Sequence, residues 1–153
     1  MDPKARALRC TRSQEGTLGG HMGLVWQEIG PGLVRGHFVV EPKHMAPLGA
    51  LQGAQGLAKD GFVHAASVIA LADTACGFGC GASLPEGAAA FTTAELKSNF
   101  LSSARLGEEV ACEARLAHGG RSTQVWDAEV VNRTRGKPMA LFRCTQMLLY
   151  PNR

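Results

Sequence analysis

Residues 61 to 80 read G-F-V-H-A-A-S-V-I-A-L-A-D-T-A-C-G-F-G-C and are almost all small or apolar. From about Phe62 to Cys80 the stretch contains no proline and places apolar side chains on every helical face, which predicts a helix buried on most sides. One residue departs from this pattern. A carboxylate such as Asp73 is costly to desolvate in an apolar helix unless it is paired, protonated or open to a cavity, so we expect it to have a function.

The rest of the chain predicts strands that surround this helix. Leu33 begins the run L-V-R-G-H-F-V-V-E-P, whose β-branched and aromatic content is typical of a first strand. Repeated glycines in residues 47 to 61 predict a loop, and Gly77, Gly79 and Gly81 are expected to help end the helix and to allow close backbone packing. Four strand-like segments follow, starting near Thr93 and then covering 108 to 117, 121 to 133 and 138 to 150.

The order of these segments predicts the architecture. Three consecutive strands joined by short turns, at 118 to 120 and 133 to 137, indicate an antiparallel meander. A single buried helix has to be covered by a curved sheet, which predicts a two-layer α+β fold. Pairing of the sheet edges with another copy of the chain would protect them.

In the first segment after the helix, alternation predicts one face with Ala94, Leu96, Ser98 and Phe100, and the opposite face with Thr93, Glu95, Lys97 and Asn99.

Length and composition narrow the class of protein. The 153 residues fit one domain, and residues 1 to 22 are expected to be a less regular segment or a short helix. The net charge of +3 comes from scattered basic residues without interleaved aromatics, which argues against nucleic acid as a partner. Five cysteines without CxxC spacing argue against a disulfide framework and favour a reducing compartment. Because the N-terminus has no apolar core and the apolar stretch contains His64 and Asp73, we expect a cytoplasmic protein without a membrane span.

The helix and the strand after it resemble a known family. The segment from His64 to Ala75, H-A-A-S-V-I-A-L-A-D-T-A, resembles the H-G-G-x-x-x-x-L-x-D-x-A signature of hotdog-fold acyl-CoA thioesterases of the phenylacetate-degradation (PaaI-like) type. The following F-T-T-A-E-L-K-S-N-F-L-S-S-A-R-L-G-E, residues 91 to 108, is similar to the strand that comes next in that family. The resemblance runs from about residue 33 to 150.

This resemblance implies a fold, an assembly and a reaction. The helix would lie inside a curved sheet, and two subunits would join their sheets edge to edge with active sites at the interface, as a dimer or a tetramer. The reaction would be hydrolysis of an acyl-CoA thioester to a free acid and CoA, with no metal or organic cofactor.

The resemblance also assigns roles to individual residues. Asp73 would act as a nucleophile or as a general base that aims a water molecule at the thioester carbonyl. The backbone N–H of Ala65, at the positive end of the helix dipole, would polarise that carbonyl, with His64 in a positioning role. Thr93 would bind the attacking water or orient the carboxylate. Ala65 and Ala66 replace the two family glycines. This replacement retains the N–H groups, narrows the pocket and affects the acyl size that fits.

Two further segments are implied to bind substrate. The turn at 118 to 123, and within it Gly120, Arg121 and Ser122, would contact the CoA phosphates through charge and backbone N–H groups. Many relatives carry an Asn or Gln upstream of the histidine, and the nearest polar candidates in this chain are Gln55 and Asp60.

Two other functions stay open from the sequence. Some hotdog proteins hydrate enoyl thioesters, and others bind or sense acyl-CoA without catalysis. Cys76 and Cys80 lie at i and i+4, a spacing that suits a metal, but no histidine lies at a useful spacing beside them, so we expect small core side chains.

Overall fold

The computed structural model describes residues 1–47 and 61–151. In these residues the chain forms α1 (Pro3–Ser13), α2 (Leu18–His21), β1 (Val25–Gly30), β2 (Leu33–Val39), the 3-10 helix η1 (Pro42–His44), α3 (Ala65–Ala82), β3 (Ala90–Phe100), β4 (Glu109–Gly119), β5 (Thr123–Asn132) and β6 (Lys137–Leu149). The loop predicted at 47 to 61 lies almost wholly outside the described residues.

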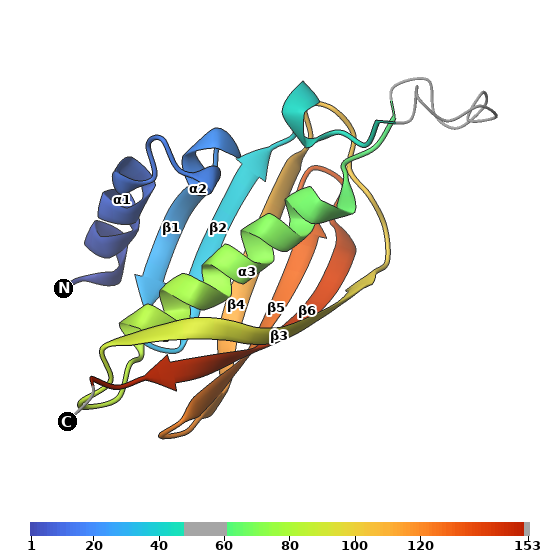
Figure 1. The fold of residues 1–153 in the computed structure, drawn as a ribbon. Helices are drawn as coiled ribbons and strands as arrows, with labels where there is room; N and C mark the ends of the chain where they lie inside the picture. The colour runs from blue at the N-terminus through green and yellow to red at the C-terminus, as the bar shows by residue number, and fades with distance from the viewer. Residues whose placement is uncertain (48–60, 152–153) are drawn as a thin grey trace.

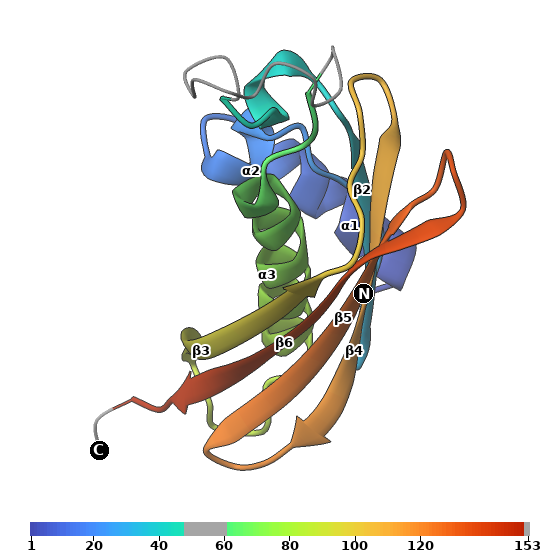
Figure 2. The same ribbon diagram turned by 90° about the vertical axis from the view of Figure 1, so that its right-hand side faces the viewer.

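The strands of the described residues form one antiparallel sheet in the order β1-β2-β4-β5-β6-β3. Since β4, β5 and β6 are neighbours in both sequence and space, the predicted meander is confirmed. Figure 1 shows α3 running along one face of the sheet, and Figure 2 shows the sheet curving around that helix. The predicted α+β fold, one long helix against a curved antiparallel sheet, is therefore confirmed.

In the N-terminal region, the structure has the helical one of the two alternatives predicted for residues 1 to 22, as α1 and the short α2. Pro3 occupies the first turn of α1, and the Asp2 side chain accepts a hydrogen bond from the Ala5 N–H at 2.9 Å, which caps the helix. The prediction that the strand at Leu33 comes first is wrong, because β1 precedes it and pairs with β2. β1 is only six residues long and contains polar residues, so its composition does not predict a strand. Its pairing with β2 stabilises the extended conformation instead.

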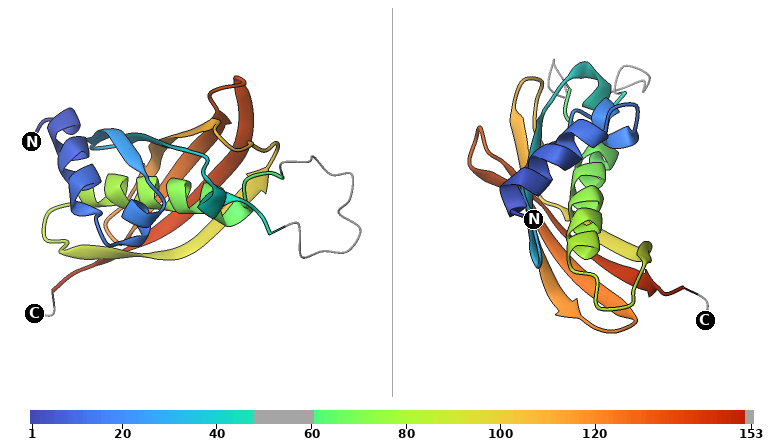
Figure 3. Two further views of the ribbon diagram at one scale, coloured as in Figure 1. Left: turned by 90° about the horizontal axis from the view of Figure 1, so that it is seen from above. Right: turned by 90° about the vertical axis from the view of Figure 1, so that its left-hand side faces the viewer.

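Helix α1 covers the outer edge of β1. The Thr11 hydroxyl oxygen accepts a hydrogen bond from the Trp26 backbone N–H at 3.0 Å, and the Gln14 side-chain oxygen accepts one from the Trp26 indole N–H at 2.7 Å. Figure 3 shows α1 beside this edge of the sheet. One edge of the sheet is therefore closed by the chain itself.

Helix α3 starts at Ala65 and continues through the three glycines to Ala82. The prediction that the glycines help end the helix is thus wrong. By length and composition α3 would also pass for a membrane span, but here its apolar face packs on the sheet. The buried positions recur every three or four residues and define a single face: Ser67, Val68, Leu71, Ala72, Ala75, Cys76, Gly79 and Cys80. The prediction of a helix buried on most sides is therefore wrong for this chain, because the sheet covers only one face of α3.

Gly79 allows the closest approach between α3 and the sheet. A Cβ atom at this position would overlap the ring of Trp126 on β5. That ring is fully buried, and its indole N–H donates a hydrogen bond to the Gln124 side-chain oxygen at 2.9 Å, so the ring cannot turn aside without breaking this bond. The close backbone packing predicted for the glycines is confirmed at this one.

We expect Gly79→Ala to lower the free energy of unfolding by about 1–3 kcal/mol, because the added methyl group forces α3 away from Trp126. Gly81→Ala is the matched control. A Cβ at Gly81 meets Phe91 at an ordinary 3.5 Å, so this change should be neutral or should stabilise the helix by up to about 1 kcal/mol. Urea unfolding measures both, and equal effects at the two glycines would contradict this account.

Candidate functional site

A β-bulge in β3 turns Thr93 toward the helix. Thr93 pairs with Gln146 on β6 and Glu95 pairs with Thr145, so Ala94 is the extra residue between them. The alternation therefore shifts by one residue, and Thr93 shares the helix-facing side with Leu96. Simple alternation put Thr93 with Glu95 on the opposite face, and that prediction is wrong because a bulge is not visible in a period-two pattern.

Asp73 lies about midway along α3, half-buried, and faces this turned-in threonine. The Thr93 hydroxyl donates to the Asp73 carboxylate at 3.3 Å. Burial raises the pKa of Asp73 above its ordinary value, and the hydrogen bond from Thr93 opposes part of that rise. The carboxylate is therefore a stronger base than an exposed aspartate, and it has one oriented hydroxyl beside it.

Behind Thr93 lies Gln146, a residue that the sequence analysis does not single out. It is fully buried, and its side-chain oxygen lies 3.1 Å from the Thr93 hydroxyl oxygen. A signal for it exists in the sequence, because Gln146 interrupts the alternation of buried residues Phe142, Cys144 and Leu148 with a polar side chain. A buried amide with a hydroxyl partner is a typical support for a polar site.

The N-terminus of α3 forms a second polar feature. His64 caps the helix, since its Nδ1 accepts the Ala66 N–H at 2.9 Å. The backbone N–H of His64 donates to the backbone oxygen of the buried His44 at 2.8 Å, and the Ser67 hydroxyl donates to the same oxygen at 3.0 Å. Among the described residues, the Ala65 N–H has no hydrogen-bond acceptor. An N–H at this positive end of a helix suits an acceptor that carries negative charge.

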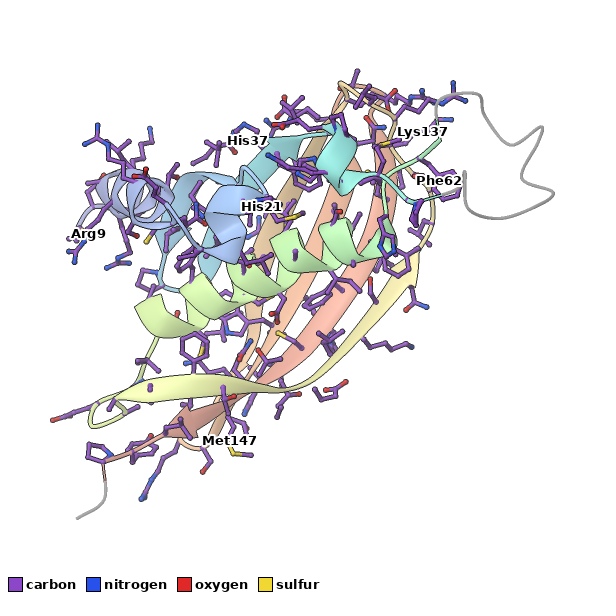
Figure 4. The ribbon with its side chains drawn as sticks, turned by 45° about the horizontal axis from the view of Figure 1, so that its top comes forward. Arg9, His21, His37, Phe62, Lys137 and Met147 are labelled. Carbon is purple, nitrogen blue, oxygen red and sulfur yellow. The ribbon has the colours of Figure 1, made fainter. Side chains whose placement is uncertain are left out.

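Asp73 and Thr93 lie near the middle of α3, whereas His64 and Ala65 lie at its N-terminal end. Phe62, labelled in Figure 4, precedes the N-terminal end of α3, whereas Met147 lies toward the opposite end of the sheet. Met147 pairs with Thr123, which follows the β4–β5 turn, so that turn lies at the C-terminal end of α3.

The predicted CoA-binding residues occupy this β4–β5 turn. The Gly120 N–H donates to the Thr123 oxygen at 2.9 Å, while the oxygens of Arg121 and Ser122 accept hydrogen bonds from the end of β6, from the Tyr150 hydroxyl and the Leu148 N–H. The turn is thus tied to the sheet. The Arg121 side chain is exposed and forms no salt bridge within the described residues. Gln55 and Asp60 lie outside the described residues.

A family model described as the thioesterase superfamily matches residues 60–139, which is more than half of the chain. The chain belongs to the thioesterase superfamily. The matched residues include α3 with Asp73 and β3 with Thr93. A search of the curated proteins finds no match.

Solved structures support the same fold for this member of the superfamily. A mutant thioesterase from Pseudomonas aeruginosa has a TM-score of 0.80 at 21% identity, over 95% of this chain and 94% of that one. The PaaI protein of the E. coli phenylacetic acid degradation operon has a TM-score of 0.73 at 22% identity, over 95% of each chain. A Streptococcus mutans protein bound to acetyl CoA has a TM-score of 0.68 at 21% identity, over 85% of this chain and 91% of that one. The predicted resemblance to PaaI-like hotdog thioesterases is confirmed.

We expect Thr93→Val to raise the pKa of Asp73 further, because the change removes the hydroxyl that stabilises its ionised form while keeping a β-branched strand residue. Carbon-13 NMR of the aspartate carboxyl groups measures the pKa, and the acidic limb of the activity profile of the thioesterase should move to higher pH with it. Thr92→Val, on the opposite face beside Met147, is the control and should leave the profile unmoved. A fall in the Asp73 pKa on Thr93→Val would contradict this assignment.

Proposed function

We propose that the protein hydrolyses an acyl-CoA thioester to a free acid and CoA, in a site that combines Asp73 of one copy with the α3 N-terminus of a second copy. Membership of the thioesterase superfamily supports hydrolysis of a thioester. The Streptococcus mutans protein of the same fold, bound to acetyl CoA, supports CoA as the thiol portion. The observation that carries the proposal is the half-buried Asp73 carboxylate with its pKa raised by burial and the Thr93 hydroxyl 3.3 Å away.

Helix geometry favours a site built from two copies. Asp73 lies eight positions after Ala65, and at about 1.5 Å of rise per residue the two lie about 12 Å apart along the axis. A hydrogen-bond donor to the thioester oxygen has to lie within about 3 Å of it, and the attacking group has to reach the adjoining carbon. One carbonyl group therefore cannot contact both the Ala65 N–H and Asp73 of the same helix.

The open edge of the sheet supports a position for the second copy. β3 is the edge strand opposite β1, and α1 covers only the β1 edge. On the side of β3 that faces the helix, Leu96 and Phe100 remain 41% and 47% exposed. A two-fold axis beside β3 would pair the two edges, cover these side chains and set the two α3 helices antiparallel. The N-terminus of the second α3 would then lie toward Asp73 of the first, and the arrangement would create two equal sites.

The chemistry follows from these groups. As a general base, Asp73 takes a proton from water while the water oxygen bonds to the thioester carbon, and the Ala65 N–H of the second copy stabilises the oxygen that becomes negative. The intermediate then breaks its carbon–sulfur bond, and the proton on Asp73 passes to the departing sulfur of CoA. As a nucleophile, Asp73 would instead bond to the acyl carbon and expel the CoA thiolate, and water would hydrolyse the resulting anhydride.

The β4–β5 turn fits contact with the CoA phosphates. It lies at the C-terminal end of α3, which is the end that an antiparallel partner helix would approach with its N-terminus. The exposed Arg121, which forms no salt bridge in the part of the chain that the structure describes, would contribute charge there, and its main chain is already held by the Tyr150 hydroxyl.

Two substitutions test the shared site. Asp73→Asn should lower kcat by about 100-fold or more, because the base is lost. Ala65→Pro should lower kcat by about 100- to 1,000-fold, because it removes the N–H while proline suits the first turn of a helix and His64 already has extended dihedral angles. When the two inactive variants are unfolded and refolded together, mixed dimers contain one intact site. About a quarter of the wild-type activity should return.

The measurement is thiol release across a panel of acyl-CoA substrates. Asp127→Asn is the matched control, since it removes a carboxylate paired with Arg143 away from the site and should retain activity. No recovery in the mixture would place both groups in one chain and refute the shared site. Full activity of Asp73→Asn would refute the mechanism. Loss of enoyl absorbance without thiol release would indicate a hydratase, and binding without turnover would indicate a non-catalytic module.

Arg121→Ala should raise KM for acyl-CoA several-fold with little change in kcat, because its charge would hold the phosphates far from the reacting carbon. With the matching acyl-pantetheine, which lacks the nucleotide phosphates, wild type and variant should have the same KM. Steady-state kinetics on the two substrates decides the point, and an equal loss on both would place Arg121 away from the phosphates.

A further inference from the structure

A line of hydrogen-bonding groups leads from Asp73 into the core. The Thr93 hydroxyl oxygen lies 3.3 Å from the Asp73 carboxylate and 3.1 Å from the side-chain oxygen of Gln146. On the far side, the Gln146 nitrogen donates to the Cys144 sulfur at 3.4 Å. Gln146 and Cys144 are fully buried, so water does not replace any of these bonds at the inner end.

The number of protons makes this arrangement sensitive to the state of Asp73. Three oxygens meet in two contacts, and the Thr93 hydroxyl has a single hydrogen. If Asp73 is protonated, it donates to Thr93, Thr93 donates to Gln146, and each contact contains one hydrogen. If Asp73 is ionised, only one hydrogen is present for two contacts, and the contact between Thr93 and the Gln146 oxygen is left without one.

The amide of Gln146 offers a solution, because it carries a donor at one corner and an acceptor at the other. With its nitrogen toward Thr93, the amide donates to the hydroxyl oxygen, and Thr93 donates to the Asp73 carboxylate. The amide oxygen then faces Cys144, whose thiol is also able to donate. In both arrangements, Asp73, Thr93, Gln146 and Cys144 each have a hydrogen-bond partner. This matters because an unpaired buried polar group is costly.

We propose that Gln146 is a positioning residue for the hydrolytic reaction. Each time Asp73 gains or loses a proton, the Gln146 amide turns over, so that its oxygen or its nitrogen faces the Thr93 hydroxyl as the hydrogen bonds require. This inference rests on the proposed role of Asp73 in thioester hydrolysis. In the general-base route Asp73 takes a proton from water and later gives it to the CoA sulfur, so the line would reverse twice in each turnover. A leucine or methionine at position 146 could support neither direction.

Among the described residues, Thr93 is the hydrogen-bond partner through which Gln146 would act on Asp73. The other titratable groups that face it are the thiols of Cys76 on α3 and Cys144 on β6. The hydrogen bond with Cys144, together with burial, raises the pKa of Cys76, so this thiol stays neutral. Glu95 on β3 points to the opposite face of the sheet, where it accepts a hydrogen bond from Thr145.

A double-mutant cycle tests the inference. Gln146→Met keeps the side-chain length and removes both amide groups, and we expect it to lower kcat about 5- to 10-fold with KM within two-fold of wild type. In a Thr93→Val background, the same Gln146→Met change should alter kcat by less than two-fold, because Gln146 acts only through the Thr93 hydroxyl. The pKa of Asp73 from carbon-13 NMR should respond in the same way, with Gln146→Met moving it in the Thr93 background and not in the Thr93→Val background.

The control is Gln124→Met. Gln124 is the buried neighbour of Gln146 on β5, but it bonds to Trp126 and to the Ser83 oxygen and not to Thr93, so its effects should add to those of Thr93→Val. Gln146→Asn, which withdraws the amide from Thr93, is the second variant if the methionine variant does not fold. Additive effects of Gln146→Met and Thr93→Val on both kcat and the Asp73 pKa would overturn the proposal. Because the NMR titration needs no turnover, it tests the coupling even if Asp73→Asn remains active.

Discussion

The burial of one carboxylate against the sheet is the constraint on which the rest of the site depends. Asp73 stands on a helix whose neighbouring side chains are small and apolar, and burial raises its pKa. A group with this sign of shift binds its proton more tightly in the folded chain than in the unfolded one. Folding stability therefore falls as pH rises from the ordinary aspartate pKa through the raised folded value. The same desolvation that costs stability makes the carboxylate a better base near neutral pH.

The rigidity of α3 then determines how a complete site can be assembled. A helix holds its own N-terminus and its eighth following residue at a fixed separation, so no side-chain rotation brings the Ala65 N–H to Asp73. Within residues 1–47 and 61–151, α1 closes one edge of the sheet and no strand pairs with the β3 edge, where Leu96 and Phe100 are exposed. In the proposed assembly, a second copy at that edge would supply the missing donor and cover the open edge with one symmetric contact.

The features that the sequence predicts well are those with local signals. The apolar run that contains Asp73 gives α3, and the turn residues between the last three strands give the meander. The position of Thr93 fails for a physical reason: an extra residue at Ala94 depends on how β3 pairs with β6, which alternation within β3 does not encode. Gln146 is missed because its role appears only when the pairing places it opposite Thr93. The roles of Gly120, Arg121 and Ser122 depend on an assembly and stay predictions.

The two alanines at the start of α3 are compatible with a hydrogen-bond donor at that end of the helix. His64 takes the Ala66 N–H for its cap, which leaves the Ala65 N–H as the free donor among the described residues at this end. Alanine retains this N–H and restricts the unfolded chain more than glycine does, by about 0.5–1 kcal/mol per position. Both methyl groups are exposed, so the core does not require them or oppose them. In the proposed site, completed by a second copy, they would lie beside the thioester oxygen, where they would limit the width of the acyl group and hold the donor in a fixed direction.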